Sequence, residues 1–433
     1  MKNGFSGGIH PAGKKELTGR ECPQASLNPE LVVIPLRQHI GRECEPLVKV
    51  GDAVGRNQKI GDGSGMCIPV HASVSGRVTA IEQRPHPGGG TGLCVVIQND
   101  HQKREAGELL AHDRPELLSR QEILTIIREA GIVGMGGATF PTEIKADIEE
   151  GIIDTVIVNA CECEPYITAD DMLLWGYGAE VLGGLAILGR VLGAGRMVVA
   201  VEDNKQEAID ALRRKLPEAV ELTVLPTRYP QGAEKLLIRS VTGREVPSGA
   251  KSREVGCAVF NAATCAAVFA AVVHGRPLTH RIVTVTGEGV VSPKNMIVPI
   301  GMLLSDVIRE AGGMKGNVVK VVCGGPMMGR AQETLDVPVV KGTNAVLCLT
   351  KGIAVEEAGG ICIRCGKCVE ACPVNLQPLY LYRYGTRGDV ERLERYHVAD
   401  CIECGCCAYS CPGKLPIVDR IRQGKQKRRE AMG

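Results

Sequence analysis

The chain has 433 residues, which at roughly 100 to 200 residues per domain predicts three or four domains rather than one compact core. Its 51 Lys and Arg residues nearly balance its 49 Asp and Glu residues, and a net charge of +2 gives no support for nucleic acid as a partner. Unbroken apolar runs such as 266–273 are far shorter than the ~20 residues of a spanning helix, and no signal-peptide pattern is present, so we expect a cytoplasmic protein without a transmembrane segment.

The first hundred residues are expected to form an N-terminal segment, 1–30, and a small all-β unit, 31–100. Short apolar runs in this unit are separated by Gly, Asp and Pro, the pattern of strands joined by tight turns. The sequences "VKVGDAV" and "PVHASVSGRVTAIE" resemble the barrel-sandwich fold of biotinyl and lipoyl carriers. The second hairpin has no lysine to modify, so we expect the fold without the carrier function.

Residues 115–276 alternate between helix and strand patterns. Ile123, Ile126 and Ile127 have helical spacing, and a glycine-rich loop follows them. A strand over 154–160, a long helix around 170–195 and a strand over 196–203 come next. This alternation predicts an α/β domain with a mainly parallel sheet.

Three further segments complete the predicted organisation. Residues 277–350 have two strand patterns, an amphipathic helix and another strand, which favours a β-grasp (SLBB-like) domain. Residues 355–425 form a cysteine-rich module, and 426–433 form a basic tail that we expect to be a solvated or frayed end. The fold class is therefore multidomain α/β and α+β.

Two complete Cys-x-x-Cys-x-x-Cys-x-x-x-Cys-Pro motifs give the strongest chemical signal. This spacing is that of bacterial ferredoxins, in which three cysteines bind one [4Fe-4S] cluster and the fourth binds the other cluster. One predicted cluster is therefore ligated by Cys362, Cys365, Cys368 and Cys411. The second is ligated by Cys401, Cys404, Cys407 and Cys372.

Zinc binding is the alternative for these motifs, because Cys-x-x-Cys pairs also bind zinc. A zinc site needs neither a third cysteine at the same step nor the Cys-Pro ending, so the spacing favours clusters. Cys406 is out of step with its motif, and the remaining cysteines are expected to be buried thiols. Cys161 and Cys163 flank Glu162 beside a candidate cofactor site, and metal binding there is a weaker alternative.

A glycine-rich loop, "GIVGMGGATFPTEIK", is the candidate cofactor loop. Its glycines let the backbone turn tightly and approach a phosphate group. The loop lacks the G-x-G-x-x-G spacing of a Rossmann fold, so by itself a structural role is equally compatible with it.

This loop resembles the flavin-binding loop of the NADH-oxidising 51-kilodalton subunit of respiratory complex I. Three later segments, "VNACECEPYITAD", "YPQGAEKLLI" and "FNAATCAAV", are similar to segments of that family in the same order. The resemblance implies that a flavin, FMN, and NAD(H) bind to a set of residues drawn from these four segments. Around the FMN phosphate and ribityl chain it places Gly134, Gly136, Gly137 and Lys145, and beside the flavin Asn159, Tyr229, Gly232, Asn261 and Thr264. Near the nicotinamide nucleotide it places Glu164 and Glu234 as catalytic residues, with Phe140 as a stacking face.

Over residues 5 to 424, the order of motifs resembles the C subunits of the Rnf ion-translocating ferredoxin:NAD oxidoreductase. Besides the segments above, these motifs include "GGIHP", "VIPLRQHIG", "GREVPSG", "GGPMMG" and "VVKGTNAVLCL". The resemblance implies a peripheral subunit on the cytoplasmic face of a membrane, holding FMN and two [4Fe-4S] clusters. Its implied partners are NAD(H) and the other subunits of the membrane-embedded complex, a ferredoxin-like subunit among them.

Two other functions remain open from the sequence. A soluble relative that feeds electrons to D-proline reductase resembles the same family. A flavin-free iron–sulfur relay would use the central domains only for docking. Met327 and Met328 in "GGPMMG" could face a partner, although such methionines more often fill cores.

Overall fold

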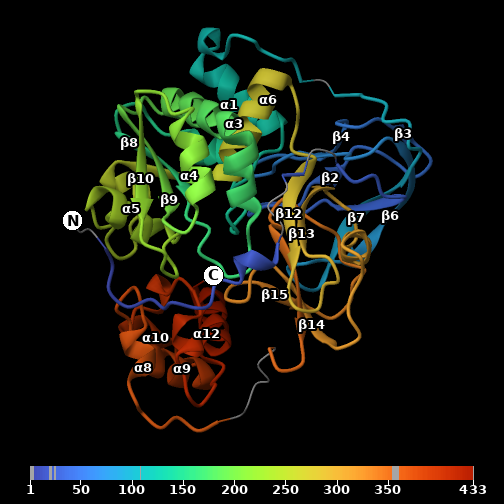
Figure 1. The fold of residues 1–433 in the computed structure, drawn as a ribbon. Helices are drawn as coiled ribbons and strands as arrows, with labels where there is room; N and C mark the ends of the chain where they lie inside the picture. Colours follow the sequence, from blue (N-terminus) through green and yellow to red (C-terminus); the bar gives the residue numbers. More distant parts are fainter. Residues whose placement is uncertain (1–3, 19–21, 24–25, 108, 354–359, 433) are drawn as a thin grey trace.

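A computed structural model describes residues 4–18, 22–23, 26–107, 109–353 and 360–432 (Figure 1). The N-terminal unit consists of two small antiparallel sheets, ordered β1-β7-β6-β3 and β2-β4-β5. Both sheets contribute to one apolar core, in which Ile34, Ile60 and Val95 are fully buried. The strands are β1 (Leu31–Pro35), β2 (Glu45–Pro46), β3 (Ala53–Val54), β4 (Lys59–Asp62), β5 (Val70–His71), β6 (Gly76–Pro85) and β7 (Thr91–Asn99).

The central domain is a four-stranded parallel sheet in the order β10-β9-β8-β11. Its strands are rich in Val and Ile because both faces are covered by helices. The strands are β8 (Thr155–Ala160), β9 (Arg196–Glu202), β10 (Val220–Leu225) and β11 (Cys257–Asn261). Helices α1 (Arg120–Glu129), α3 (Ala169–Val191), α4 (Gln206–Arg213) and α6 (Ala262–His274) pack on one face, and α5 (Glu234–Thr242) packs on the other. The short helix α2 (Thr142–Ala146) follows the glycine-rich loop.

Local signals in the sequence explain where these helices begin. Ser119 and Glu122 form a reciprocal capping box at the start of α1. Asn261 caps α6 by accepting a hydrogen bond from the amide of Ala263, and Gly275, with φ of +62°, ends that helix. The glycine-rich loop between α1 and α2 is therefore held at both ends by well-defined helices.

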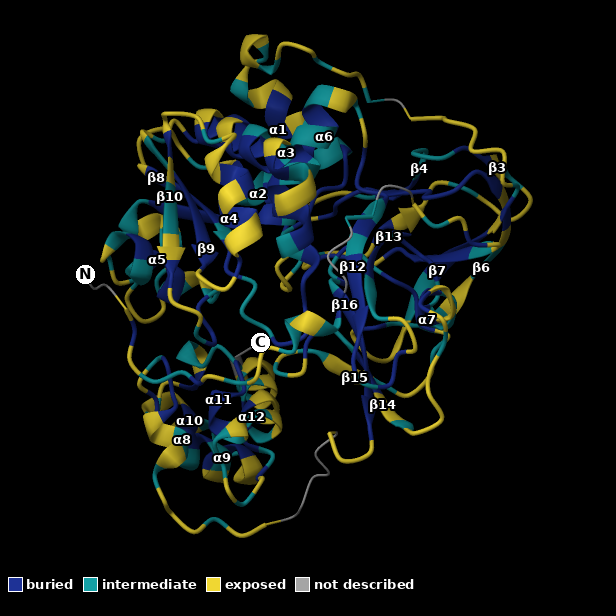
Figure 2. Ribbon diagram, viewed as in Figure 1, coloured by how far each residue is buried: buried dark blue, intermediate teal, exposed yellow. Residues whose placement is uncertain are grey.

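Helix α3 is long and apolar enough, by length and composition, to cross a membrane, but 61% of its most apolar window is buried inside the protein. It packs against α6, and a side chain at Gly184 would meet the backbone carbonyl of Cys265 at 1.8 Å. Glycines interrupt the apolar residues of this helix, so its sequence contains no long unbroken apolar run. Those glycines allow close helix packing, and the apolar surface of α3 is used in the core (Figure 2).

The third domain is a five-stranded mixed sheet in the order β13-β12-β16-β14-β15. The parallel β12–β16 pair lies at its centre, and the other pairs are antiparallel. Its elements are β12 (His280–Thr286), β13 (Lys294–Pro299), α7 (Leu304–Glu310), β14 (Val318–Cys323), β15 (Arg330–Gln332) and β16 (Ala345–Thr350).

The C-terminal module is helical and lies beside the central domain (Figure 1). The predicted start of this module at residue 355 lies outside the described residues. Its helices are α8 (Lys367–Glu370), α9 (Pro378–Arg387), α10 (Val390–Arg395), α11 (Cys406–Tyr409) and α12 (Ile417–Met432). Four single-turn 3-10 helices complete the elements of the described residues: Lys15–Leu17, Pro115–Leu117, Ser252–Val255 and Val398–Asp400.

Residues 426–433 were predicted to be a solvated or frayed basic tail. Over 426–431 the side chains are exposed except that of the half-buried Arg428, and the segment is helical rather than frayed. This segment is the second half of α12, which packs along α9. Lys425 donates to the carbonyl of Cys401 at 2.6 Å, and Arg428 pairs with Glu394. The basic side chains thus attach the last helix to the rest of the module.

Candidate functional site

The eight motif cysteines line two separate cavities in the C-terminal module. One cavity is lined by Cys362, Cys365, Cys368 and Cys411. The other is lined by Cys372, Cys401, Cys404 and Cys407, with Cys406 also at its wall. In each case three cysteines of one motif meet the last cysteine of the other motif. Four thiols in an apolar shell are the donor set that a [4Fe-4S] cluster requires.

The two cysteine loops have the same backbone conformation. Arg364 and Gly366 in the first loop have φ of +55° and +81°, and Glu403 and Gly405 in the second have +56° and +82°. Each glycine then begins a four-residue helix, α8 or α11. The sequence repeat is therefore also a structural repeat.

The two cavities differ in their surroundings. Cys365 is exposed, and its neighbours Ile361 and Ile363 are 85% and 70% exposed. By contrast, Cys404 and Cys407 are buried. The cavity of the second motif therefore faces the interior, and the cavity of the first motif lies at the surface.

The glycine-rich loop lies where β8 and β11 end. Its backbone is held by a hydrogen bond from the amide of Gly134 to the carbonyl of Phe140 (2.8 Å) and by one from Met135 to the hydroxyl of Thr264 (2.9 Å). At Gly137 the φ angle is +125°, a conformation that favours glycine, and an added Cβ would meet no atom within 4 Å. The loop thus leaves room for a ligand beside its backbone.

Two asparagines lie side by side at the carboxyl ends of neighbouring strands. Asn159 on β8 is in register with Asn261 on β11. The amide of Asn159 donates to the carbonyl of Gly232 at 2.8 Å, and that of Asn261 donates to Asp170 at 2.6 Å. In open α/β sheets, ligands bind at this edge. The structure therefore brings together Asn159, Gly232, Asn261 and the glycine loop.

Lys145 and Glu234 form a direct ion pair, with Nζ 2.8 Å from Oε2. Lys145 also lies 5.6 Å from the centre of the Phe260 ring, and Glu234 accepts a hydrogen bond from Ser252. The two residues were assigned to the flavin phosphate and to the nicotinamide nucleotide, so this pair connects the two predicted subsites.

Glu164 is held by the "GGPMMG" loop of the β-grasp domain. Its carboxylate oxygens accept hydrogen bonds from the amides of Met327 (3.1 Å) and Met328 (2.8 Å). Burial raises the pKa of Glu164 to about 7, although these two amides and Lys15 act in the opposite direction. Glu164 can therefore change its charge near neutral pH.

Lys15 is a residue of the site that sequence reasoning missed. Its ammonium donates to the carbonyls of Glu162 (2.8 Å), Glu164 (3.0 Å) and Ile167 (2.5 Å). Burial, followed by the charge of Lys205, lowers the pKa of Lys15 to about 8. Lys15 thus fixes the backbone of the acidic segment that carries Glu164. It lies about 150 residues away in a Gly- and Pro-rich segment, and no pattern in the sequence marks it.

A buried ion pair lies beneath the same segment. Lys205 is fully buried, and its Nζ lies 3.1 Å from a carboxylate oxygen of Glu162. The other oxygen of Glu162 accepts the amide of Asp170 at 2.7 Å. Burial raises the pKa of Glu162, but Lys205 and Lys15 outweigh this effect and lower it. Glu162, and not only Glu164, is therefore part of the architecture of the acidic segment.

Tyr229 connects the central domain to the second cluster cavity. It is 2% exposed, and its hydroxyl donates to the carbonyl of Cys404 at 2.7 Å. Cys163 and Met327 pack in the same small cluster as Tyr229 and Cys404. The residues predicted to bind the flavin thus lie in contact with the wall of a cluster cavity.

The N-terminal segment reinforces this junction. Ile9 pairs with Tyr229 through two backbone hydrogen bonds of 2.9 and 3.0 Å, and the amide of Gly8 donates to the carbonyl of Ala371 at 3.0 Å. Arg228 donates to the carbonyls of Phe5 and Gly7. The segment therefore binds the C-terminal module to the central domain.

Comparison with known families assigns each part of the chain. Residues 3–102 match the RnfC barrel-sandwich hybrid domain, 127–270 the Nuo51 FMN-binding domain, 282–331 the SLBB domain and 354–412 the 4Fe-4S dicluster domain. These matches confirm the predicted fold class. The fold and the sites define a flavin- and iron–sulfur-containing electron-transfer protein.

Curated relatives identify the family. The C subunit of the Na+-translocating ferredoxin:NAD+ oxidoreductase complex of Acetobacterium woodii is 43% identical over 98% of this chain and 97% of its own length. The C subunit of the proton-translocating complex of Clostridium ljungdahlii is 43% identical over 100% and 95%. The C subunit of the ion-translocating oxidoreductase complex of Erwinia tasmaniensis is also 43% identical, but the chain covers 53% of its length. The chain belongs to the RnfC family, the C subunits of ion-translocating ferredoxin:NAD+ oxidoreductase complexes.

A solved structure shows a similar fold. The NAD+-reducing [NiFe]-hydrogenase has 21% sequence identity and a TM-score of 0.50, with 73% of this chain and 64% of that chain covered. The match to an FMN-binding domain argues against the flavin-free relay, and the relatives' names give no support to a proline reductase partner.

Proposed function

We propose that this chain is the NAD(H)-reacting subunit of a membrane-associated ferredoxin:NAD+ oxidoreductase complex and lies peripherally at the cytoplasmic face. As a member of the RnfC family it is one subunit of a multi-subunit ion-translocating oxidoreductase. The observation that carries the proposal is the contact of Tyr229 with Cys404, because it joins the predicted flavin site to a predicted cluster site.

The residues at the edge of the parallel sheet fit FMN. Gly134, Gly136 and Gly137 let the backbone approach a phosphate, and Lys145 supplies a cation close by. Asn159 and Asn261 offer amide groups to a flavin, with Thr264 supporting the loop from behind. Bound FMN would exchange an electron pair with NAD(H) and single electrons with the clusters. NAD(H) transfers electrons in pairs and each cluster transfers them singly, so the flavin would connect the two.

The surroundings of the clusters suggest the order of electron transfer. A cluster held by Cys401, Cys404, Cys407 and Cys372 would border Tyr229, and it would be the cluster that exchanges electrons with a bound flavin. The cluster of Cys362, Cys365, Cys368 and Cys411 lies at the surface among exposed Ile361 and Ile363, where a partner can approach. We infer that the partner that binds at this exposed apolar rim is a ferredoxin-like subunit of the complex.

The decisive experiment uses the full chain, purified anaerobically with reconstituted clusters. We expect one FMN to be released on denaturation, and NADH-dependent reduction of an artificial one-electron acceptor. Glu164→Gln should lower this activity by about 10- to 100-fold without removing iron, because it takes a charged carboxylate from the nicotinamide subsite. Iron-containing protein without flavin or NADH oxidation would overturn the proposal.

The pH dependence of this activity tests the role of Glu164 directly. Its pKa of about 7 means that the carboxylate form, which holds the amides of Met327 and Met328, is present above pH 7 and is lost below it. We expect kcat/KM to rise through pH 7 in the wild type and to be flat in Glu164→Gln. The free energy of unfolding should change with pH in the opposite direction to kcat/KM. Because the folded pKa lies above the ordinary 4.5, the contribution of Glu164 is present at low pH and is lost as the pH rises through 7.

A further inference from the structure

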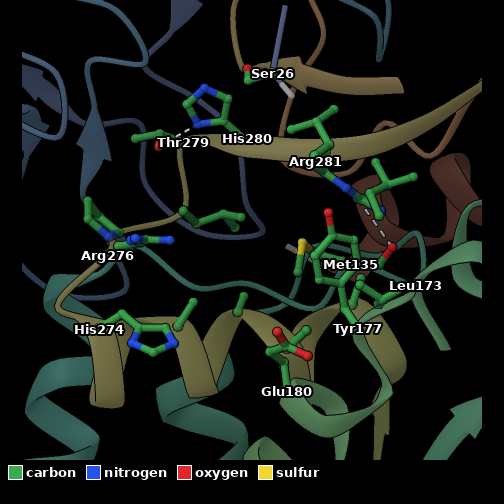
Figure 3. A pocket seen from close by; sticks show the side chains of 18 of the residues that line it. Ser26, Met135, Leu173, Tyr177, Glu180, His274, Arg276, Thr279, His280 and Arg281 are labelled. Carbon is green, nitrogen blue, oxygen red and sulfur yellow. Dashed lines mark hydrogen bonds between the residues drawn. The ribbon is translucent and has the colours of Figure 1, made fainter. Parts of the chain in front are cut away.

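A large cavity lies between α3, α6 and β12, at the junction of the three larger domains (Figure 3). Its volume of about 610 Å³ is within the range of sites that bind small molecules. None of the residues assigned to FMN or NAD(H) lines it. The cavity is therefore distinct from the proposed reaction site.

One wall of the cavity is flat and apolar. It consists of Ala263, Ala266, Ala267 and Ala270, which lie three or four residues apart and so share one face of α6. A second wall comes from α3 and contains Leu173 and Tyr177, while β12 lies across the cavity from α6 (Figure 3). Helix α3 departs from helical geometry at Tyr177, with φ of −125° and ψ of 29°, and its hydroxyl donates to the carbonyl of Pro23 at 2.8 Å. The ring of Tyr177 is thus held in place beside the alanine face.

The cation available at the cavity is Arg276. Arg56 is already paired with Glu105, and Arg281 donates to the carbonyls of Met135 and Lys341. Arg276, just beyond the end of α6, forms no ion pair with any residue in the described part of the chain. Its side chain extends toward the cavity, on the same side as His274 (Figure 3).

The backbone near Arg276 does not oppose an anion strongly. Near the end of α6, the carbonyls of Ala270, Ala271 and Val272 accept hydrogen bonds from the amides of Arg276, Gly275 and His112, at 3.1 Å each. This capping reduces the negative character that the end of a helix would otherwise present.

The other polar groups lie apart from Arg276. Glu180, on α3, lies on the Tyr177 side of the cavity, across from Arg276 (Figure 3). His280, on β12, also borders the cavity, and its Nδ1 lies 2.9 Å from the hydroxyl of Thr279. Burial lowers the pKa of His280 to about 4, so it is a neutral hydrogen-bonding group at physiological pH. The cavity thus combines a flat apolar slot with a cation at one end and an acceptor at the other.

We propose that this cavity is a second nucleotide site that binds a nucleoside monophosphate. The base lies between the alanine wall and Tyr177, with an exocyclic amine toward Glu180, and the phosphate lies at Arg276 and His274. Met135 contributes to the cavity wall and also belongs to the glycine loop, where its amide bonds to Thr264. Binding is therefore in a position to stiffen the loop of the proposed flavin site.

Calorimetric titration of the full chain with AMP tests the site without flavin turnover. Arg276→Glu should weaken AMP binding at this site by at least about 10-fold, the contribution of one charge-assisted hydrogen bond. Ala267→Phe should remove binding by filling the slot. The matched control is Arg213→Glu, a charge reversal at an exposed side chain of α4, and it should leave binding unchanged.

Because AMP could also enter the nicotinamide nucleotide subsite, binding sites are counted in the wild type and in each variant. We expect Arg276→Glu and Ala267→Phe each to lose one site while the KM for NADH is unchanged, and adenosine or inorganic phosphate to bind at least about 10-fold more weakly than AMP. Unchanged AMP stoichiometry in both variants overturns the proposal. Loss of NADH oxidation in Arg276→Glu also overturns it, because the cavity would then belong to the reaction site.

Discussion

The two cofactor regions of this protein are built in opposite ways. In the C-terminal module, all eight predicted cluster ligands come from residues 362–411, and two copies of one loop conformation present them. The proposed flavin site takes residues from the glycine loop, two strand ends and the segment after β10, and depends on Lys15 and on the Met327–Met328 amides. A local repeat is sufficient to form one region, whereas the other exists only after distant segments have packed together.

The difference also appears in the chemistry of the two regions. The cluster cavities are lined by thiols and apolar side chains, with Leu381 and Ile421 among those fully buried in the module. The flavin region rests on buried charges, where Lys205 pairs with Glu162 and Lys15 donates to three carbonyls. Buried charges are stable only when paired, so this region should be more sensitive to single substitutions outside its ligand-binding residues.

The largest effect is expected from removing a cluster ligand. Cys404→Ser should abolish the second cluster, halve the iron content and stop electron transfer from NADH to ferredoxin, while reduction of bound flavin by NADH continues. The loss of electron transfer should exceed the roughly 10- to 100-fold effects that are typical of substituting residues that hydrogen-bond to metal ligands. Iron analysis and stopped-flow absorbance measure both quantities.

The adjacent Cys406 provides the control for this experiment. It is buried at the wall of the same cavity but is out of step with the motif. Cys406→Ser should therefore retain iron. If Cys406→Ser lost iron as Cys404→Ser does, the ligand assignment taken from the motif spacing would be wrong.

A smaller effect, outside the ligand set, is expected at Lys15. Lys15→Met leaves three carbonyls of the acidic segment without their donor and should lower the free energy of unfolding by about 2–4 kcal/mol. FMN should bind more weakly, while iron content is unchanged. Flavin fluorescence titration and denaturant unfolding measure the two effects.

Lys14 gives a matched comparison because it is the neighbouring residue of the same type. Its side chain is 40% exposed and its nearest carboxylate, on Glu288, is 3.8 Å away. Lys14→Met should change stability by less than about 1 kcal/mol. Equal effects of the two substitutions would show that Lys15 has no special role in holding the acidic segment.

The smallest effect is expected where the two regions meet. Tyr229→Phe removes the hydroxyl that donates to the carbonyl of Cys404 and should cost about 1–2 kcal/mol of stability. We also expect slower electron transfer from reduced flavin to the clusters, with an unchanged KM for NADH. Tyr166→Phe, which loses a hydrogen bond to Glu288 instead, should leave this transfer rate unaltered. If Tyr229→Phe transferred electrons at the wild-type rate, the contact between Tyr229 and Cys404 would not be part of the electron path.

Much of the fold could be predicted because its signals are local. The runs that became β8 and β9 alternate with helical patterns, and this alternation predicted the parallel sheet. The solvent exposure of the basic tail was predicted from its charges, whereas its helical structure and the bonds of Lys425 and Arg428 to Cys401 and Glu394 were not. Such partners cannot be read from the tail itself.

The sequence by itself determined the chemistry of the clusters, since cysteine spacing sets which sulfurs a short loop can direct to one point, and glycines allow its turns. It also determined that a glycine-rich loop precedes the sheet. Only the tertiary structure decided that Lys15 supports the acidic segment, that Glu164 is held by Met327 and Met328, and that a cavity separates α6 from β12. The contacts of Lys15 and Glu164 join residues about 150 positions apart, and they are decided by how the domains pack rather than by any local preference of the chain.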